Sequence, residues 1–153
     1  MVINLAGGLK LGSEINLHAP AMLPENYCAH IHERLVLYKR LANCETPEEL
    51  EGMHEELVDR FGLLPDPAKV LLETHRLRIA AKLLGISRID AGPESLVLQF
   101  IPNPPIDPAR IIKLVQSRKT YKLGGQDRLR VEAAMPDVAA RVTQARAVLK
   151  ELG

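Results

Sequence analysis

The pattern of apolar residues changes at Gly85, and this change constrains the fold more than any other feature of the chain. Before Gly85, apolar side chains recur at the three- and four-residue spacing of amphipathic helices. After it, residues 86–91 and 96–101 are strand-like runs joined by a Gly92-Pro93 turn. Helices followed by strands mixed with helices predict an α+β fold. We expect a helical N-terminal half of three helices, packed with a small antiparallel sheet and two further helices.

Local signals set the limits of the three helices before Gly85. Thr46, Pro47 and Glu49 form the pattern of a capping box, so a helix is predicted to begin at Pro47 and to end at Gly62. Residues 66–84 are expected to form a helix with two apolar faces. An earlier helix, over about residues 24–43, is predicted to bury a stripe that consists of Cys28, Ile31, Leu35, Tyr38 and Ala42, with Leu37 and Leu41 beside it.

The second half of the chain is predicted to contain shorter elements. Asp107-Pro108 starts a short helix, Gly124-Gly125 between two strand-like runs indicates a hairpin, and Pro136 starts the last helix. Residues 14–18 are expected to form a short strand. Residues 1–13 are glycine-containing and are expected to be a flexible lead-in or linker. Residues 14–153 are then predicted to form a single domain.

The composition restricts the kind of core and the kind of partner. Of 153 residues, 46% are hydrophobic but only 3% are aromatic and none is Trp, so the core must be aliphatic. So few rings offer little for stacking on the bases of single-stranded nucleic acid. No apolar run reaches the roughly 18 residues of a membrane span, and two cysteines do not make a disulfide framework. We expect a cytoplasmic protein without a membrane partner.

Candidate catalytic and metal-binding groups are sparse. The chain has no phosphate-binding loop and no nucleophile motif. Zinc would need Cys28, His30 and His32, with Cys44 and His18 nearby in the sequence, but on a helix Cys28 and His30 point about 200° apart. A small metalloenzyme built on these residues is an alternative that this spacing disfavours. The remaining histidines, His54 and His75, fit core or boundary positions of helices better than the role of a catalytic base.

Charge is distributed unevenly along the chain. Residues 45–66 carry eight acidic residues and one cation, a net charge of −7 in a protein whose total is +1. From residue 106 onward there are ten Lys and Arg against five Asp and Glu. The basic residues that could contact phosphate are Lys113, Arg118, Lys119, Lys122, Arg128 and Arg130. A solvated surface explains them more simply, although weak nonspecific DNA contact stays open.

The acidic helix is harder to explain as a merely solvated surface. With its leucines facing the core, Glu48, Glu55 and Asp59 lie near the opposite pole, and Glu49 and Glu56 share one flank. Acids favour the first turn of a helix, but the helix dipole disfavours those of the later turns. No lysine offers an i,i+4 pair before Arg60. Physical reasoning supports an acidic docking face and a solvated face about equally.

Three motifs resemble the C-terminal domain of the bacterial transcription-repair coupling factor, Mfd. They are Glu14-Ile15-Asn16-Leu17, the segment from His32 to Asn43, and above all the segment from Glu55 to Pro67, which reads Glu-Glu-Leu-Val-Asp-Arg-Phe-Gly-Leu-Leu-Pro-Asp-Pro. The resemblance covers roughly residues 14 to 152, and the density of matching residues falls after about residue 86. The chain is expected to be a fragment of a longer protein.

The resemblance implies a regulatory role without catalysis. In that family an ATP-driven DNA translocase releases stalled RNA polymerase and recruits the excision-repair protein UvrA. The C-terminal domain has no ATPase chemistry; it packs on the UvrA-binding module of the same protein and masks it. The resemblance thus implies an autoinhibitory domain that is not an enzyme and binds no cofactor, with ATP and magnesium belonging to the parent protein.

The resemblance also indicates which residues dock and with what. Family docking residues lie on the helix before the Arg-Phe-Gly sequence, which places Glu56 and Asp59 first and Glu49 second. The expected direct partner is the UvrA-binding module, with UvrA and RNA polymerase as indirect partners and no strong nucleic-acid binding by this domain. The alternative is a nucleic-acid-binding module that uses the basic C-terminal half.

Overall fold

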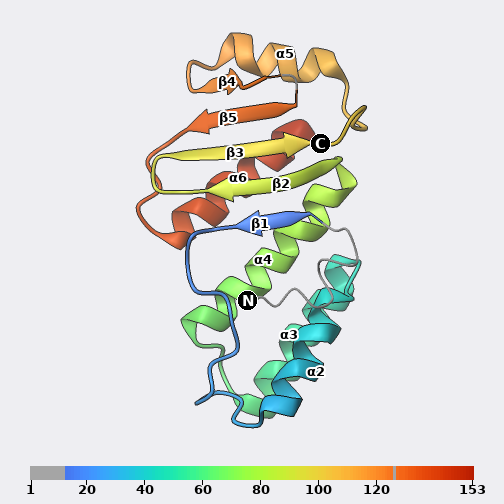
Figure 1. Ribbon diagram of the computed structural model, residues 1–153, viewed down its shortest axis with the longest axis vertical. Coiled ribbons are helices and arrows are strands. Elements are labelled where there is room, and N and C mark those ends of the chain that lie inside the picture. Colours follow the sequence, from blue (N-terminus) through green and yellow to red (C-terminus); the bar gives the residue numbers. More distant parts are fainter. Residues whose placement is uncertain (1–12, 126) are drawn as a thin grey trace. The chain divides into compact units, whose positions relative to one another are not determined.

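A computed structural model describes residues 13–125 and 127–153 of the chain (Figure 1). The described residues fold into two compact units. The helical unit comprises Ala19–Ile79, and the sheet unit comprises Ser13–His18 together with Ala80–Gly153. Five helices and a five-stranded sheet are present in the described part of the chain, which confirms the predicted α+β class. The predicted lead-in lies outside the described residues, apart from Ser13.

The helical unit contains α2 (Ile31–Ala42), α3 (Pro47–Phe61) and most of α4 (Asp66–Leu83). The capping box is confirmed, because the Thr46 side chain accepts a hydrogen bond from the Glu49 amide and the Glu49 side chain accepts one from the Thr46 amide. Gly62 ends α3 at a φ of 97°, a conformation that residues with a Cβ rarely adopt. The sequence signals therefore placed α3 correctly.

The first helix differs from the prediction. It begins at Ile31, so Cys28 is buried in the preceding turn, and α2 buries Leu37 and Leu41. Of the predicted stripe, Ile31 is 65% exposed and Leu35 is 44% exposed, whereas Cys28 is buried and Tyr38 packs, partly buried, against the core. Leu37 and Leu41, which lie beside this stripe on the helix, are the residues of α2 that are fully buried in the core. The core of the helical unit is aliphatic, as the composition required.

The sheet of the second unit has the order β1-β2-β3-β5-β4. Its strands are β1 (Glu14–Asn16), β2 (Ile86–Ala91), β3 (Ser95–Phe100), β4 (Tyr121–Leu123) and β5 (Arg128–Glu132). The prediction of a purely antiparallel sheet is corrected, since β1 pairs with β2 in parallel. A parallel pair needs a long connection, and the whole helical unit lies between these two strands in sequence.

Two further helices complete the sheet unit, α5 (Pro108–Ser117) and α6 (Val138–Leu152). The last helix starts later than predicted because Asp137, rather than Pro136, is the N-cap residue that accepts a hydrogen bond from the Ala140 amide. Figure 1 shows α6 behind the sheet and α5 beside β4. On the strands, buried residues alternate with exposed ones, so one face of the sheet packs on the core and the other carries polar side chains.

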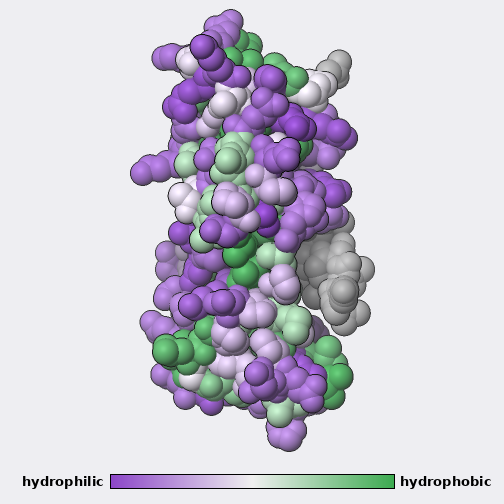
Figure 2. Space-filling model, turned by 90° about the vertical axis from the view of Figure 1, so that its left-hand side faces the viewer, coloured by the Kyte–Doolittle hydropathy of each residue, from purple (hydrophilic) through white to green (hydrophobic). Residues whose placement is uncertain are grey.

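Gly85 separates the last turn of α4 from β2, as predicted. Its φ is 71°, and a Cβ placed there would lie 2.7 Å from the Pro105 ring. Both the backbone conformation and the lack of space require glycine at this position. Within the described residues, no helix is long and apolar enough to cross a membrane. Figure 2 shows a face on which hydrophilic side chains surround small hydrophobic patches.

Candidate docking surface

One flank of α3 is held by arginine side chains. Arg40 on α2 donates two hydrogen bonds to the Glu56 carboxylate, both at 2.7 Å, and Arg60 donates a third at 3.0 Å. Arg60 also binds Glu33 at 2.7 Å, so these four residues form one ion cluster between α2 and α3. The hydrogen bonds from Arg40, with a further one from Arg60, lower the pKa of Glu56 to about 2. Glu56 is thus already paired within its own unit.

Glu49 is engaged at the start of the same helix. Its carboxylate accepts hydrogen bonds from the amides of Glu45 (2.8 Å) and Thr46 (3.2 Å). These are backbone donors that a helix start would otherwise leave without a partner. A partner protein that binds the Glu49 carboxylate would therefore have to share it with these two amides or break their hydrogen bonds.

The other flank of α3 is held by Arg76 from α4. Its guanidinium donates to Glu73 at 2.5 Å, and it lies 3.3 Å from Glu51 and 3.2 Å from the Nδ1 atom of His54. His54 is half-buried in this cluster, in agreement with the boundary position that we predicted for it. Arginines of neighbouring helices therefore pair with Glu56 on one flank of α3 and with Glu51 on the other.

Only the outer pole of α3 keeps unpaired carboxylates. Glu48, Glu55 and Asp59 are exposed, and within the described residues their side chains make no ion pair or hydrogen bond. We call these three residues the acidic strip. Of the predicted docking residues, Asp59 belongs to the strip, whereas Glu56 and Glu49 lie on the paired flank. The helical wheel placed the strip at this pole but could not show that acids on the flanks are paired, because Arg40 and Arg76 lie on other helices.

A shallow cavity lies between α3, the loop after it and α4 in the helical unit. Its volume is about 480 Å³, and Val58, Leu63, Leu64 and Leu72 form its apolar lining. Leu63 is 86% exposed, which is unusual for so large an apolar side chain. His54 and Arg76 also line the cavity, so it adjoins the flank of α3 that Arg76 holds. Sequence reasoning did not identify this cavity.

Arg78 on α4 links this helix to the end of α2, and the partly buried His75 lies beside it. Burial, together with the neighbouring Arg78, lowers the pKa of His75 to about 4. Arg78 donates to His75 Nδ1 at 3.1 Å and to the carbonyl oxygens of Leu41 and Cys44 at 3.3 and 2.9 Å. The last two groups end α2 and begin the loop after it. His75 thus has a boundary position with one hydrogen bond, in agreement with the core or boundary position that the sequence indicated.

The candidate zinc ligands do not converge. Cys28 and Cys44 are free and buried, and burial raises the pKa of both thiols. His30 and His32 are exposed. Among the described residues, no group of three or more His, Cys, Asp or Glu side chains is placed to hold a metal ion. Cys28 lies in a turn and not in the helix that we predicted there, so the 200° angle between Cys28 and His30 does not apply.

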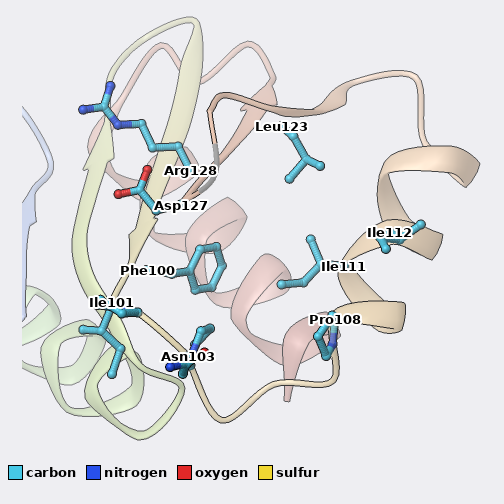
Figure 3. Close-up of a pocket in the computed structure, with 11 residues that line it drawn as sticks. Phe100, Ile101, Asn103, Pro108, Ile111, Ile112, Leu123, Asp127 and Arg128 are labelled. Carbon is cyan, nitrogen blue, oxygen red and sulfur yellow. The ribbon is translucent and has the colours of Figure 1, made fainter.

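The predicted basic patch is partly paired. Lys122 lies 3.2 Å from Glu132, Arg118 pairs with Glu151, and within the described residues Arg128 has no ion pair. A cavity of about 730 Å³ adjoins this region, between α5, the end of β3 and the hairpin of β4 and β5. Figure 3 shows Phe100, Ile111 and Leu123 pointing into it. Its only charged lining residues are Asp127 and Arg128, which do not form a catalytic group.

Comparison with known proteins places this arrangement in a family. Residues 17–111 match the family described as the TRCF domain. The transcription-repair-coupling factor of Escherichia coli K12 is 37% identical over 141 residues, and that of Haemophilus influenzae is 35% identical over 131 residues. These matches cover 92% and 85% of this chain but only 12% and 11% of the two relatives. The chain thus spans about an eighth of the length of these relatives.

A solved structure confirms the fold. It is described as the crystal structure of the C-terminal domain of a transcription-repair coupling factor, and its TM-score with this chain is 0.71 at 21% sequence identity. The alignment covers 92% of this chain and 94% of that one. The family match and the relatives together carry the assignment: the chain belongs to the transcription-repair coupling factor family, as the region that corresponds to its C-terminal domain.

Proposed function

We propose that this chain is an autoinhibitory domain that docks on the UvrA-binding module of its own protein and masks the UvrA-binding surface. The observation that carries the proposal is the acidic strip of Glu48, Glu55 and Asp59, which the fold leaves unpaired while it pairs acids on both flanks of the same helix. An unpaired carboxylate can bind a basic partner without breaking an internal ion pair, so the strip is the part of α3 that docks most readily.

The rest of the parent protein supplies the activity in this proposal. ATP- and magnesium-dependent movement along DNA and contact with RNA polymerase belong to segments outside this chain, which is about an eighth of the length of its relatives. This domain itself is not an enzyme and needs no cofactor. Engagement of a stalled polymerase releases the domain, and UvrA then reaches its binding module in transcription-coupled repair.

The energy that such a mask requires is modest. Holding the closed state at about 99% needs about 2.7 kcal/mol. An exposed ion pair contributes roughly 0.2–1 kcal/mol, so the strip alone reaches this figure only at its upper limit. The cavity lined by Val58 and Leu63 offers a place for an apolar side chain of the partner, which would supply the remainder. A salt-sensitive interface with one apolar contact fits a gate that must open again.

The structure changes which substitutions test the proposal. Reversing Glu56 would disrupt the cluster with Arg40 and Arg60, so weaker docking could result from local distortion. The clean variant is Glu55→Gln with Asp59→Asn, which removes two charges that have no internal partner. Its matched control is Glu25→Gln with Glu94→Gln, which removes two exposed carboxylates outside the strip.

The experiment is a titration of this chain against the separately produced UvrA-binding module at low and at high salt, with UvrA as competitor. We expect binding that weakens with salt, competes with UvrA, and falls about fivefold or more in the strip variant but not in the control. Equal binding by both variants would refute the role of the strip. Absence of binding at any salt would refute the proposed mask.

A further inference from the structure

The polar face of the sheet carries a set of side chains that the proposed docking surface does not use. In the sheet unit, α6 lies behind the sheet in Figure 1, and the face toward the viewer is not covered by any helix of that unit's described residues. On this open face the outward positions of β2, β3 and β5 are charged or polar apart from Val97 on β3, whereas the alternate positions are buried. The open face is therefore available to a partner.

The strand register brings two arginines from distant parts of the sequence into one row. Arg88 on β2 lies opposite Gln99 on β3, and Gln99 lies opposite Arg128 on β5. Because neighbouring strands are about 4.8 Å apart, the two arginines are about 10 Å apart at their Cα atoms, with the glutamine amide between them. Together with Asp90 and Val97, they line a concavity of about 240 Å³.

The donors of this row are largely unused. Arg128 makes no ion pair with the described residues. Arg88 lies 3.7 Å from Glu14 and from Asp90, which is beyond a good hydrogen bond, and Asp90 accepts its closest contact from His18 at 2.6 Å. The Gln99 amide reaches Asp127 only at 3.4 Å. An arriving anion would therefore meet guanidinium and amide donors without displacing a strong internal pair.

A second row on the same face adds positive charge. Arg130 lies opposite Lys122 on β4, and both are near Glu132, at 3.8 and 3.2 Å respectively. The four cations of the face are matched by four carboxylates, which are Glu14, Asp90, Asp127 and Glu132. This balance indicates few contacts and modest affinity rather than the dense positive patch of a tight binder.

We propose that the row of Arg88, Gln99 and Arg128 binds a backbone phosphate of double-stranded nucleic acid. The planar guanidinium fork fits a phosphate, and two forks on either side of an amide suit a group with several acceptor oxygens. The aromatic rings of this unit, Phe100 and Tyr121, are buried, so the open face offers no platform for unpaired bases. Val97 is the only apolar residue of the concavity, so an anchoring pocket for a peptide side chain is lacking there.

The test measures salt-dependent binding of this chain to a labelled DNA duplex of roughly 20 base pairs, between about 25 and 200 mM salt. The loss of one neutralised phosphate lowers the slope of log affinity against log salt by about 0.9. We expect Arg88→Gln with Arg128→Gln to lower the slope by this amount and to weaken binding about fivefold or more at the lowest salt. Arg88→Lys with Arg128→Lys keeps the charges and should restore most of the slope.

The control removes the same net charge from another place. Lys82→Gln with Lys150→Gln neutralises two exposed lysines on the helices of the sheet unit, and should change DNA affinity less than about twofold. Equal losses in both double variants, or no DNA binding by the unaltered chain at the lowest salt, would overturn the proposal. Displacement of the duplex by an acidic peptide with the same number of negative charges would also overturn the proposal. The face would then recognise carboxylates rather than a phosphate backbone.

Discussion

The helical unit and the sheet unit differ in where their arginines form bonds. In the helical unit, Arg40, Arg60 and Arg76 bind carboxylates on the surface at hydrogen-bond distance and pair with acids on both flanks of α3. In the sheet unit, Arg141 is buried and donates to four backbone carbonyl groups. Of the surface arginines of that unit, Arg118 pairs with Glu151, whereas Arg88 reaches carboxylates only at 3.7 Å.

This difference identifies the groups that are left over for partners. The fold of the helical unit engages three of the six acids of α3, and the three of the acidic strip remain. In the sheet unit, Arg141 bonds inside the fold, and the donors of Arg88 and Arg128 on the open face remain. Candidate binding groups are thus best found by subtracting the pairs that the fold already makes, rather than by counting charges along the sequence.

Arg141→Met should give the largest effect and tests the buried side of this comparison. Arg141 donates to the carbonyl groups of Met135 (3.0 Å), Leu17 (3.1 Å), Pro136 (3.3 Å) and His18 (3.4 Å), and so joins the end of β1 to α6. Methionine fills similar space but leaves buried carbonyl oxygens without donors. We expect a loss of about 3 kcal/mol in the free energy of unfolding, measured in urea.

Hydrogen exchange shows where this loss falls. Amides of β1 and β2 should lose protection in the Arg141→Met protein, while those of α2 and α3 keep theirs. The control Lys150→Met removes an exposed cation from the same helix and should be nearly neutral. Equal loss of protection in both units would show that the two units unfold together. Arg141 would then not stabilise the sheet unit alone.

His75 should give the next largest effect, through pH. Its folded pKa of about 4 lies below the ordinary 6.5, so the unfolded chain binds more protons between these values. The stability that neutral His75 contributes is complete above pH 6.5 and is lost as the pH falls through about 4. We expect roughly 2 kcal/mol of pH-dependent loss in urea unfolding, absent in His75→Gln, whose side chain can still accept from Arg78. An unchanged pH profile in that variant would exclude His75 as the cause.

The sequence predicted those features that depend on neighbouring residues. The capping box at Thr46, the stop at Gly62 and the strand runs after Gly85 are local signals, and the structure confirms them. The prediction from sequence was wrong where one helix carries two apolar stripes. The stripe of Ile31 and the stripe of Leu37 are both apolar, and only packing against other helices decides between them.

The candidate sites were predictable to a smaller extent. The pole of α3 follows from helical geometry, so Glu55 and Asp59 could be placed on one exposed side. The pairing of Glu56 with Arg40, sixteen positions earlier in the sequence, depends on how α2 lies against α3, which the sequence between them does not specify. The row of Arg88 and Arg128 is even less accessible, because it follows from the pairing of three strands and not from a motif.

Arg40→Gln should give the smallest effect and tests the surface side of the comparison. It removes the two 2.7 Å hydrogen bonds to Glu56 but leaves the bond from Arg60. Because both side chains are partly exposed, solvent screening limits the loss of stability at neutral pH to about 1 kcal/mol or less. The pKa of Glu56 should rise from about 2 toward its ordinary 4.5, which NMR titration of its carboxyl carbon measures directly.

The stability of the Arg40→Gln variant should also depend on pH differently from that of the unaltered chain. A carboxylate with a lowered pKa stabilises the fold above its unfolded value of 4.5, and that contribution is lost as the pH falls through about 2. The stability difference between the unaltered chain and Arg40→Gln should therefore shrink over this window, whereas Lys39→Gln, the adjacent exposed position on α2, should differ little at any pH. If Arg40→Gln lowered the free energy of unfolding as much as Arg141→Met, the surface arginine would matter as much to stability as the buried one. The difference that we draw between the two units would then be wrong.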